Sequence, residues 1–302
     1  MRILVAGALG EVGRTVARAL REHGHDVVPA SSRAPLVGAP EVVGLEEAAT
    51  LVHAREVDAV LSAAGRGDRR QGERSGLDAT GVLGPVCAAA GVPGVLLSTT
   101  RVLEGHDVDY LEDAPPRPRT PYAEANARNE EQWLAQGGTA ASVLRITNYF
   151  CQPASLASPQ SLLLPWSLVT EALQAGRIGV RSGPSTSREF VSAADVAAAA
   201  LVLVADRPVG GVCATTPGLA ATLSDLTSAV QGAFRRIGLD APAASFGEDT
   251  VAGPACLPGW LAERGWAGGL TLTDVEGAIA DWVIRWAGSE RPPNPVSEVL
   301  QP

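Results

Sequence analysis

The sequence predicts an α/β fold: a doubly wound, mainly parallel β-sheet with helices on both faces, joined to a smaller C-terminal part. Short runs rich in Val, Leu and Ile alternate with longer segments of helical spacing through the first half of the chain. The strand-like runs are almost continuously apolar, as expected of strands covered on both faces. Closely spaced glycines follow the first run. Together these features favour strand–helix–strand units and a parallel sheet.

The elements of the first half follow from apolar spacing and from the residues at their ends. After an apolar strand at residues 2–6, the segment 11–23 places Val12, Val16 and Leu20 on one helical stripe, and Gly24 ends it. The same reasoning predicts further strands at residues 26–30, 42–43, 57–63, 94–98 and 141–146, and helices at residues 45–56, 76–90 and 122–136.

The second half of the chain is less regular. Residues 151–165 are rich in Pro, Ser and Leu and predict a loop, whereas residues 168–175 predict a helix. Residues 190–205 combine a short strand with a helix. The tail, residues 291–302, has three prolines among its first five residues and is expected to be extended or disordered.

The composition indicates a globular protein. With 302 residues, 46% of them hydrophobic and 19% charged, the chain can bury a large core as one domain or two closely associated ones. No uninterrupted apolar run reaches the roughly 18 residues needed to cross a bilayer. Because an apolar strand begins at residue 3, we expect no signal peptide and a cytoplasmic location.

Charge and cysteine spacing narrow the classes of partner. The formal net charge of −9 argues against nucleic-acid binding, which needs a basic face. All 24 basic residues are arginines, and these still suit a small anionic ligand. The four cysteines, Cys87, Cys151, Cys213 and Cys256, are not spaced as a metal or redox pair. We therefore expect buried free thiols and no metal site.

The glycines after the first strand predict a dinucleotide-binding turn, as in Rossmann-like folds. Gly7, Gly10 and Gly13 form the pattern G-x-x-G-x-x-G between a strand and a helix. We predict that these glycines, with Glu11 and Val12 between them, contact the cofactor. Glycine permits the tight turn, lets the backbone approach a pyrophosphate and lets the helix pack on the strand. The N–H groups at the helix N-terminus then bind the phosphates. A glycine-rich turn without a ligand is the alternative.

The end of the second strand bears on the form of the cofactor. NAD binding uses a carboxylate there, which holds the ribose 2′-hydroxyl. Here the strand is followed by Ser31, Ser32 and Arg33, and an arginine offers paired donors to a phosphate. We therefore predict NADP in preference to NAD. The alternative is that Arg33 is only a solvated loop charge.

Motifs spread over most of the chain resemble one family. They are the glycine turn at residues 7–13, the turn Ala63-Ala64-Gly65, the segments 98–105 (STTRVLEG) and 121–126 (PYAEAN), the strand end 144–148 (LRITN), the segments 188–191 (REFV) and 195–197 (DVA), and the late pair 265–266 (GW). This set resembles the extended short-chain dehydrogenase/reductases. Within them it is most similar to the NAD-dependent nucleotide-sugar epimerases and dehydratases and to the dTDP-4-keto-sugar reductases. The resemblance implies that the turn at residues 63–65 contacts the cofactor.

The resemblance also implies a catalytic set. Tyr122 matches the family's tyrosine, which exchanges a proton with the substrate oxygen while hydride passes to or from the nicotinamide. Thr99, or Thr100 in its place, matches the hydroxyl that hydrogen-bonds the same oxygen. Asn126 stands where the family has a lysine that binds the cofactor ribose and stabilises the ionised tyrosine.

Asn126 departs from the family pattern P-Y-x-x-x-K. Its amide has the spacing to reach the ribose but carries no charge to stabilise a phenolate, and an unperturbed tyrosine titrates near ~10. Alcohol oxidation is therefore disfavoured. Carbonyl reduction is less affected, because it needs a neutral tyrosine as the acid. The substitution leaves open a protein that binds the cofactor without redox chemistry.

Thr100, Asn148 and Arg188 are candidate substrate contacts. Asn148 lies just beyond a strand's carboxyl end, where open parallel sheets bind ligands, and a turn-forming asparagine is the alternative. Arg188 occupies a motif position that suits a substrate phosphate, and an ion pair with Asp195 or Glu189 is equally expected.

We interpret the chain as an NADP-dependent oxidoreductase that reduces a ketone on a small metabolite, such as a nucleotide-linked keto-sugar. The alternative is a cofactor-binding relative without redox turnover: a sensor, or a non-redox lyase, isomerase or cyclase. Residues 1–150 with 185–213 form the predicted dinucleotide-binding domain, and residues 151–184 with 214–302 the predicted substrate-binding part. Because the family often forms dimers, a homodimer is one expected assembly.

Overall fold

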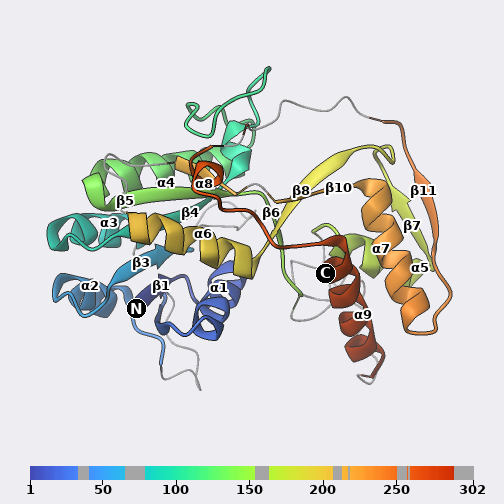
Figure 1. The fold of residues 1–302 in the computed structure, drawn as a ribbon, viewed down its shortest axis with the longest axis horizontal. Helices are drawn as coiled ribbons and strands as arrows, with labels where there is room; N and C mark the ends of the chain where they lie inside the picture. The colour runs from blue at the N-terminus through green and yellow to red at the C-terminus, as the bar shows by residue number, and fades with distance from the viewer. Residues whose placement is uncertain are drawn as a thin grey trace, which may run out of the picture. The chain divides into compact units, whose positions relative to one another are not determined.

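The structure is a computed structural model that describes residues 1–32, 41–64, 79–153, 163–206, 213–216, 218–249, 257 and 259–288 (Figure 1). The chain divides into two compact units. Unit 1 comprises Met1–Tyr149, Val191–Pro217 and Gly253–Gly268, and unit 2 comprises Phe150–Phe190, Gly218–Ala252 and Gly269–Pro302.

Unit 1 is built on a six-stranded sheet with the order β2-β1-β3-β4-β5-β9. Its strands are β1 (Arg2–Ala6), β2 (Asp26–Ala30), β3 (Ala59–Ser62), β4 (Gly94–Thr99), β5 (Ala141–Ile146) and β9 (Cys213–Thr215). Its helices are α1 (Glu11–Glu22), α2 (Leu45–His53), α3 (Ala79–Ala90), α4 (Pro121–Gly137), α6 (Ala193–Asp206) and α8 (Trp260–Glu263), with the 3-10 turns η1 (Thr100–Leu103) and η2 (Gly138–Ala140). All neighbouring strands run parallel.

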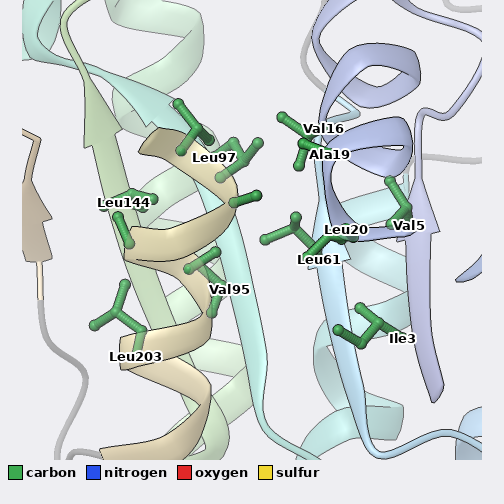
Figure 2. Close-up of a cluster of buried hydrophobic side chains, with 14 of the residues drawn as sticks. Ile3, Val5, Val16, Ala19, Leu20, Leu61, Val95, Leu97, Leu144 and Leu203 are labelled. Atoms are coloured by element: carbon green, nitrogen blue, oxygen red, sulfur yellow. The ribbon is translucent and has the colours of Figure 1, made fainter. Parts of the chain in front are cut away.

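Helices cover both faces of this sheet (Figure 1). On one face, α1 and α6 bury a cluster that contains Val16 and Leu203 together with strand residues such as Leu61 and Val95 (Figure 2). On the other face, α2, α3 and α4 bury a second cluster that includes Leu83 and Trp133. Each large aliphatic side chain buried in this way contributes about 1.5–3 kcal/mol. The two covered faces explain the continuously apolar strands and confirm the predicted α/β fold.

The predicted strand at residues 42–43 is reduced to a single bridge. Val43 pairs in parallel with Ala30, and its carbonyl accepts a hydrogen bond from the Ser31 N–H at 3.0 Å. Gly44 is already the N-cap of α2. The chain therefore turns into the helix before a longer strand can form.

The strand order reverses between β1 and β3. From β1 the chain passes to β2 on one side, and later it crosses to β3 on the other side of β1. In open parallel sheets, ligands bind beyond the carboxyl ends of the strands at such a reversal. The turns that follow β1 and β3 both lie at this place.

Unit 2, with the strands that lead into it, has two small sheets. One has the order β10-β8-β6, and the other pairs β11 with β7. The strands are β6 (Asn148–Phe150), β7 (Arg177–Val180), β8 (Ser187–Ser192), β10 (Leu219–Thr222) and β11 (Ala243–Phe246), and the helices are α5 (Trp166–Ala175), α7 (Leu223–Arg236) and α9 (Leu272–Gly288). Buried Trp166 stacks on Phe150 with ring centroids 5.4 Å apart and packs against Trp282 at 5.5 Å, which gives the unit its own core.

The units differ from the predicted domain boundaries in two important places. The prediction assigns residues 185–190 to the first domain and residues 253–268 to the second, whereas the structure places each in the other unit. The first segment stays in unit 2 because β8 pairs with β10. The second stays in unit 1 because the Trp260 N–H donates to the Glu112 carboxylate. The nucleotide-binding and substrate-binding roles of the two parts stay predictions.

Three cysteines are free thiols, as predicted: Cys87 and Cys151 are buried and Cys213 is partly buried. Burial raises the pKa of the Cys87 thiol to about 12, so this thiol is protonated at neutral pH. Cys256, the predicted tail at residues 291–302 and residues 154–162 of the predicted loop lie outside the described residues.

Within the described parts of the chain, no helix combines the length and the hydropathy that a membrane span requires.

Candidate functional site

The turn after β1 is a close-packed glycine cradle. Gly7 has a φ of +80°, and a Cβ there would lie 2.8 Å from the Ala63 carbonyl carbon and from the Ala64 nitrogen. The left-handed backbone and the lack of room both require glycine. The Gly7 N–H donates to the Ala30 carbonyl at 2.9 Å, which ties the turn to β2. The structure thus brings the predicted residues Gly7, Ala63 and Ala64 together at the reversal of the strand order.

Gly10 and Gly13 set helix α1 against this turn. A Cβ on Gly13 would lie 2.3 Å from the Gly7 carbonyl oxygen, so only glycine allows the helix to approach this closely. Gly10 donates its N–H to the same oxygen at 2.8 Å and is the N-cap of α1, with no side chain to cap the helix. An uncapped helix N-terminus with its positive dipole end suits a pyrophosphate. The cradle therefore fits the phosphates of a dinucleotide.

Glu11 places a carboxylate in the first turn of α1, where it would repel an anion. Its side chain is 13% exposed and forms an ion pair with Arg14 at 2.8 Å, and this pairing offsets the negative charge. Val12, the other predicted contact in this turn, packs against the core beside α1.

The residues predicted to choose between NADP and NAD are only partly described. Ser31 is buried after β2, and Ser32 is exposed. Arg33 and Gly65, both predicted cofactor contacts, lie outside the described residues.

Thr99 stands at the carboxyl end of β4. It is buried, and its hydroxyl oxygen accepts a hydrogen bond from the Arg101 N–H at 3.3 Å, which caps η1. Thr100, the alternative hydroxyl, is partly exposed in the first position of η1. The Thr99 hydroxyl keeps its own proton available for a further hydrogen bond, because it acts as an acceptor in the cap.

Tyr122 and Asn126 lie in the first two turns of α4. The hydroxyl of Thr120 caps this helix by accepting from the Ala123 N–H at 3.2 Å, and Pro121 fills its first position, as is favoured there. Tyr122 is 41% exposed. Asn126 is buried, and its amide nitrogen donates to the Tyr122 carbonyl at 2.9 Å. One of its donors is thus used within the helix.

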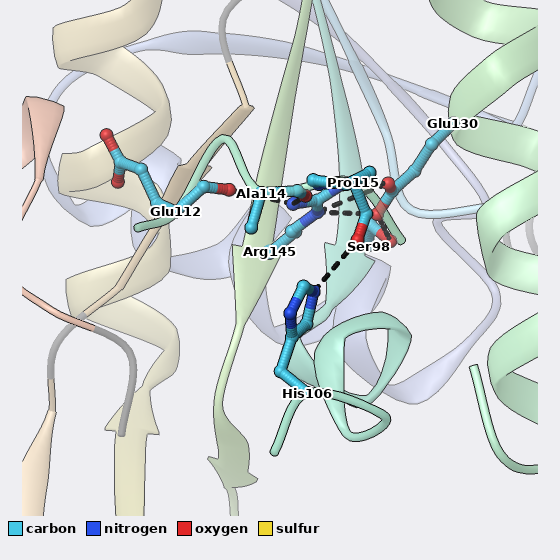
Figure 3. Close-up of polar contacts among 7 residues, drawn as sticks. All are labelled: Ser98, His106, Glu112, Ala114, Pro115, Glu130 and Arg145. Carbon is cyan, nitrogen blue, oxygen red and sulfur yellow. Dashed lines mark hydrogen bonds and ion pairs between the residues drawn. The ribbon is translucent and has the colours of Figure 1, made fainter. Parts of the chain in front are cut away.

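A buried ionic cluster links α4 to β4 and β5, and none of its residues was among the predicted site residues (Figure 3). The Arg145 guanidinium on β5 contacts the Glu130 carboxylate on α4 at 2.7 Å, and the two side chains are 2% and 3% exposed. The Ser98 hydroxyl on β4 donates to the same carboxylate. The signal that the sequence offered was spacing: Glu130 follows Asn126 by four residues and therefore continues the Tyr122 side of the helix.

Arg145 also holds the chain between η1 and α4. Its Nη1 donates to the Glu112 carbonyl at 2.7 Å. The buried Glu112 carboxylate in turn accepts from the Thr215 N–H at 2.9 Å and from the Trp260 N–H. A Cβ on Gly259 would lie 2.3 Å from the Glu112 carboxyl carbon, so glycine is required where the late segment crosses Glu112.

The predicted substrate contacts Asn148 and Arg188 lie in different units. Asn148 is exposed at the start of β6 in unit 1, and Arg188 is exposed on β8 in unit 2. The Arg188 guanidinium donates to the Ser187 carbonyl at 2.8 Å, and Asp195 instead accepts from the Ser192 N–H at 2.9 Å. Burial raises the pKa of the neighbouring Glu189 carboxyl. Their roles toward a substrate stay predictions.

Comparison with models of known families identifies the family of this chain. Residues 1–156 match the model of the RmlD substrate binding domain, which is more than half of the 302-residue chain. The chain belongs to this family. The match confirms the resemblance to the extended short-chain dehydrogenase/reductases and, with it, the prediction of an enzyme. The roles of Tyr122, Thr99 and Asn126 stay predictions.

Solved structures with the same fold span almost the whole chain. MoeE5, solved in complex with UDP-glucose and NAD, is 21% identical with a TM-score of 0.70, covering 95% of this chain and 100% of that one. DesIV, a dTDP-glucose 4,6-dehydratase from Streptomyces venezuelae with NAD and TYD bound, is 20% identical with a TM-score of 0.68, covering 95% and 98%. A UDP-glucose-4-epimerase from Stenotrophomonas maltophila, with bound NAD and formylated UDP-arabinopyranose, is 19% identical with a TM-score of 0.69, covering 96% and 100%. No curated protein matches the sequence.

Proposed function

We propose that this protein is an oxidoreductase that uses a nicotinamide dinucleotide to modify a sugar carried by a nucleotide. One observation carries the proposal: three predicted parts of the site belong to the same unit. The glycine cradle of Gly7 and Gly13 follows the carboxyl end of β1, and Thr99 ends β4. Helix α4, whose first turn carries Tyr122, packs beside β4. MoeE5 and the epimerase, which share the fold, were each solved with NAD and a nucleotide sugar. This supports the same substrate class here.

The reaction that the residues support best is reduction of a ketone on the sugar to an alcohol. When bound, the nicotinamide supplies the hydride that the carbonyl carbon needs. Tyr122 donates its phenolic proton to the carbonyl oxygen, and the Thr99 hydroxyl hydrogen-bonds that oxygen and orients it. Because Tyr122 is 41% exposed, it regains the proton from solvent. Reduction starts from the neutral phenol, so it does not require a charge at position 126.

The form of the cofactor is a separate part of the proposal. NADP is favoured because no carboxylate follows β2 at Ser31 and Ser32, where NAD-binding sheets use one to hold the ribose. The solved neighbours hold NAD, and NAD is the alternative. We expect NADPH to bind more tightly than NADH in a fluorescence titration, and Arg33→Ala to narrow the difference. Equal affinities in the wild type contradict the preference for NADP.

A cofactor-binding protein without redox turnover is the second candidate. It is favoured by Asn126, which is uncharged and donates one amide hydrogen to the Tyr122 carbonyl. Such a protein would bind the nicotinamide dinucleotide through the same glycine cradle, so cofactor binding does not separate the two candidates. A measurement of hydride transfer separates them.

The deciding experiment follows the absorbance of NADPH, and separately of NADH, with a panel of nucleotide-linked 4-keto-sugars. We expect consumption with at least one keto-sugar and at least a 100-fold loss of kcat in Tyr122→Phe, because the proton donor is removed. Tyr110→Phe is the matched control, since Tyr110 lies outside the proposed site. No consumption with any keto-sugar overturns the redox proposal, and full activity of Tyr122→Phe overturns the role of that tyrosine.

A further inference from the structure

Helix α4 is held against β4 at two levels. At the amino end of the strand, a Cβ on Gly94 would lie 2.7 Å from the Trp133 ring, and the indole N–H donates to the carbonyl of Ser142 on the neighbouring strand β5 at 3.1 Å. At the carboxyl end, the Ser98 hydroxyl donates to the Glu130 carboxylate. The helix therefore runs antiparallel to β4, and the turns before Glu130 extend past the end of the strand.

The contact at the carboxyl end is a joint of three elements (Figure 3). The Glu130 carboxylate receives the Ser98 hydroxyl from β4 and, from β5, the Arg145 Nη2 at 2.7 Å and Nε at 3.1 Å. All three side chains are buried. A buried pair with these hydrogen bonds filled tolerates little displacement, because a shift leaves charge or polar groups unpaired. We call these three residues, Ser98, Glu130 and Arg145, the Glu130 joint.

The Glu130 joint is close in the chain to both proposed catalytic hydroxyls. Thr99 directly follows Ser98. Tyr122 precedes Glu130 by two steps of four residues, on the same side of α4 and about 12 Å along its axis. Because Tyr122 lies about 12 Å along the helix axis from the joint, a change of tilt or rotation at the joint displaces Tyr122 more than residues nearer the joint.

We propose that Ser98 and Glu130 are positioning residues that set the orientation of Tyr122 relative to Thr99. They act through the helix and touch neither substrate nor cofactor. The expected loss of catalytic rate rests on the proposed function, whereas the expected displacement of Tyr122 does not. Because a displacement of about 1 Å at a reacting group can cost about 100-fold in rate, we expect kcat to fall by about 10- to 100-fold when the joint is weakened.

Fluorine NMR of the full chain tests the structural consequence without any substrate. The chain has three tyrosines, so 3-fluorotyrosine gives three resonances that Tyr→Phe variants assign. We expect Ser98→Ala and Glu130→Gln to shift or split the Tyr122 resonance. The Tyr149 resonance should stay unchanged, because the Tyr149 hydroxyl is hydrogen-bonded to Thr15 on α1. If Ser98 and Glu130 only added stability, their substitution would lower the unfolding temperature without moving the Tyr122 resonance of the folded protein.

Two matched variants serve as controls. Glu131→Gln removes an exposed carboxylate next to Glu130 on α4, and Ser142→Ala removes a buried hydroxyl at the other end of the sheet. We expect both to leave the Tyr122 resonance and kcat unchanged. If Glu130→Gln does not fold, the result for Ser98→Ala tests the proposal, because this variant leaves the ion pair between Glu130 and Arg145 in place. An unmoved Tyr122 resonance in folded Ser98→Ala overturns the proposal.

Kinetics with the keto-sugar found above test the catalytic consequence. In Ser98→Ala we expect the lower kcat together with a cofactor Kd within about twofold of the wild type, since the glycine cradle is untouched. An unchanged kcat in an active enzyme overturns the positioning role. If the wild type turns over no keto-sugar while the Tyr122 resonance still moves in Ser98→Ala, the proposed function fails and the positioning of Tyr122 stands.

Discussion

Gly7 and Gly13 are required by close backbone contacts. A Cβ at either position would lie within 3 Å of backbone atoms, whereas one at Gly24 or Gly44 would meet nothing within 4 Å. Gly24 has a φ of +80° and serves to end α1 in the left-handed conformation. Glycines that look alike in the sequence thus differ in function. Only the first pair brings the helix N-terminus and two strand ends into one cradle.

The first prediction concerns Gly13→Ala. The added methyl group overlaps the Gly7 carbonyl, so the turn must move, and we expect a loss of about 1–3 kcal/mol in unfolding free energy and at least 10-fold weaker cofactor binding. Urea denaturation and NADPH fluorescence titration measure the two effects. Gly44→Ala is the control. Cofactor affinity equal to the wild type in folded Gly13→Ala would remove the cradle from the proposed site.

The second prediction concerns Asn126→Lys. A lysine one helical turn from Tyr122 adds a positive charge that favours the phenolate, and alcohol oxidation needs this base. We expect oxidation at neutral pH to rise at least 10-fold, and reduction to change less than threefold because it starts from the neutral phenol. Initial rates in both directions against pH measure this. The gain should vanish when Tyr122→Phe is added, because the two residues act as a unit. A gain that survives the second substitution contradicts this account.

At the scale of the elements, hydrogen bonds at helix N-termini explain where several helices begin. Thr120 caps α4 through the Ala123 N–H. In α7, Thr222 and Asp225 form a reciprocal capping box, with the Asp225 N–H donating to the Thr222 hydroxyl at 3.0 Å. Such local signals are readable in a sequence, because they depend on residues three apart. The N-termini of α1 and α2 each begin at a glycine and lack a side-chain cap.

The third prediction concerns Asp225→Ala in the α7 capping box. Hydrogen bonds from the Thr222 hydroxyl and N–H lower the pKa of the Asp225 carboxyl. A carboxyl whose pKa is lower in the folded state stabilises above its unfolded pKa, near ~3.9, and loses this effect as the pH falls through the folded pKa. We expect the variant to be about 1 kcal/mol less stable at pH 7, with a difference that shrinks below about pH 4. Urea denaturation across this pH range measures it, with exposed Ser224→Ala as the control. A difference that is constant down to pH 2 contradicts the ionic origin.

At the scale of the whole molecule, unit 1 is assembled from three separate stretches of chain. The Glu112 carboxylate joins the last of them to the sheet, because it accepts from Trp260 in the late segment and from Thr215 on β9. Arg264 adds an ion pair with Asp206 and lies over the Trp260 ring, 3.7 Å from its centroid. The Glu112 carboxylate therefore holds together segments more than 100 residues apart.

The fourth prediction concerns Glu112→Ala. The substitution leaves the buried Thr215 N–H and the partly buried Trp260 N–H without their acceptor, so we expect a loss of about 2–3 kcal/mol in unfolding free energy. Urea denaturation followed by tryptophan fluorescence measures the loss. Asp107→Ala is the matched control, since its ion pair with Arg119 is exposed and is expected to contribute less than about 1 kcal/mol. Equal stability of the two variants would show that Glu112 does not hold the late segment.

The sequence was sufficient for five of the six strands of the unit 1 sheet, all except β9, and for the glycine cradle. The strand predicted at residues 141–146 coincides with β5, and the helix predicted at residues 122–136 lies within α4. Both depend on apolar spacing and on local signals at the ends of the elements, which act over a few residues. Local spacing also named the glycines of the cradle, whereas the candidates Thr99 and Tyr122 came from the family resemblance, and their roles stay predictions.

Only the tertiary structure decided the short strands of unit 2, the place of the late segment and the Glu130 joint. Strands such as β7 and β11 have four residues each and exist because they pair across more than 60 residues of chain. In the sequence, Glu130 resembles any solvent-exposed carboxylate of a helix. Its contacts with Ser98 on β4 and Arg145 on β5 exist only in the folded structure. These features arise from contacts between distant segments, and residues far apart in the chain carry no local pattern that records their pairing.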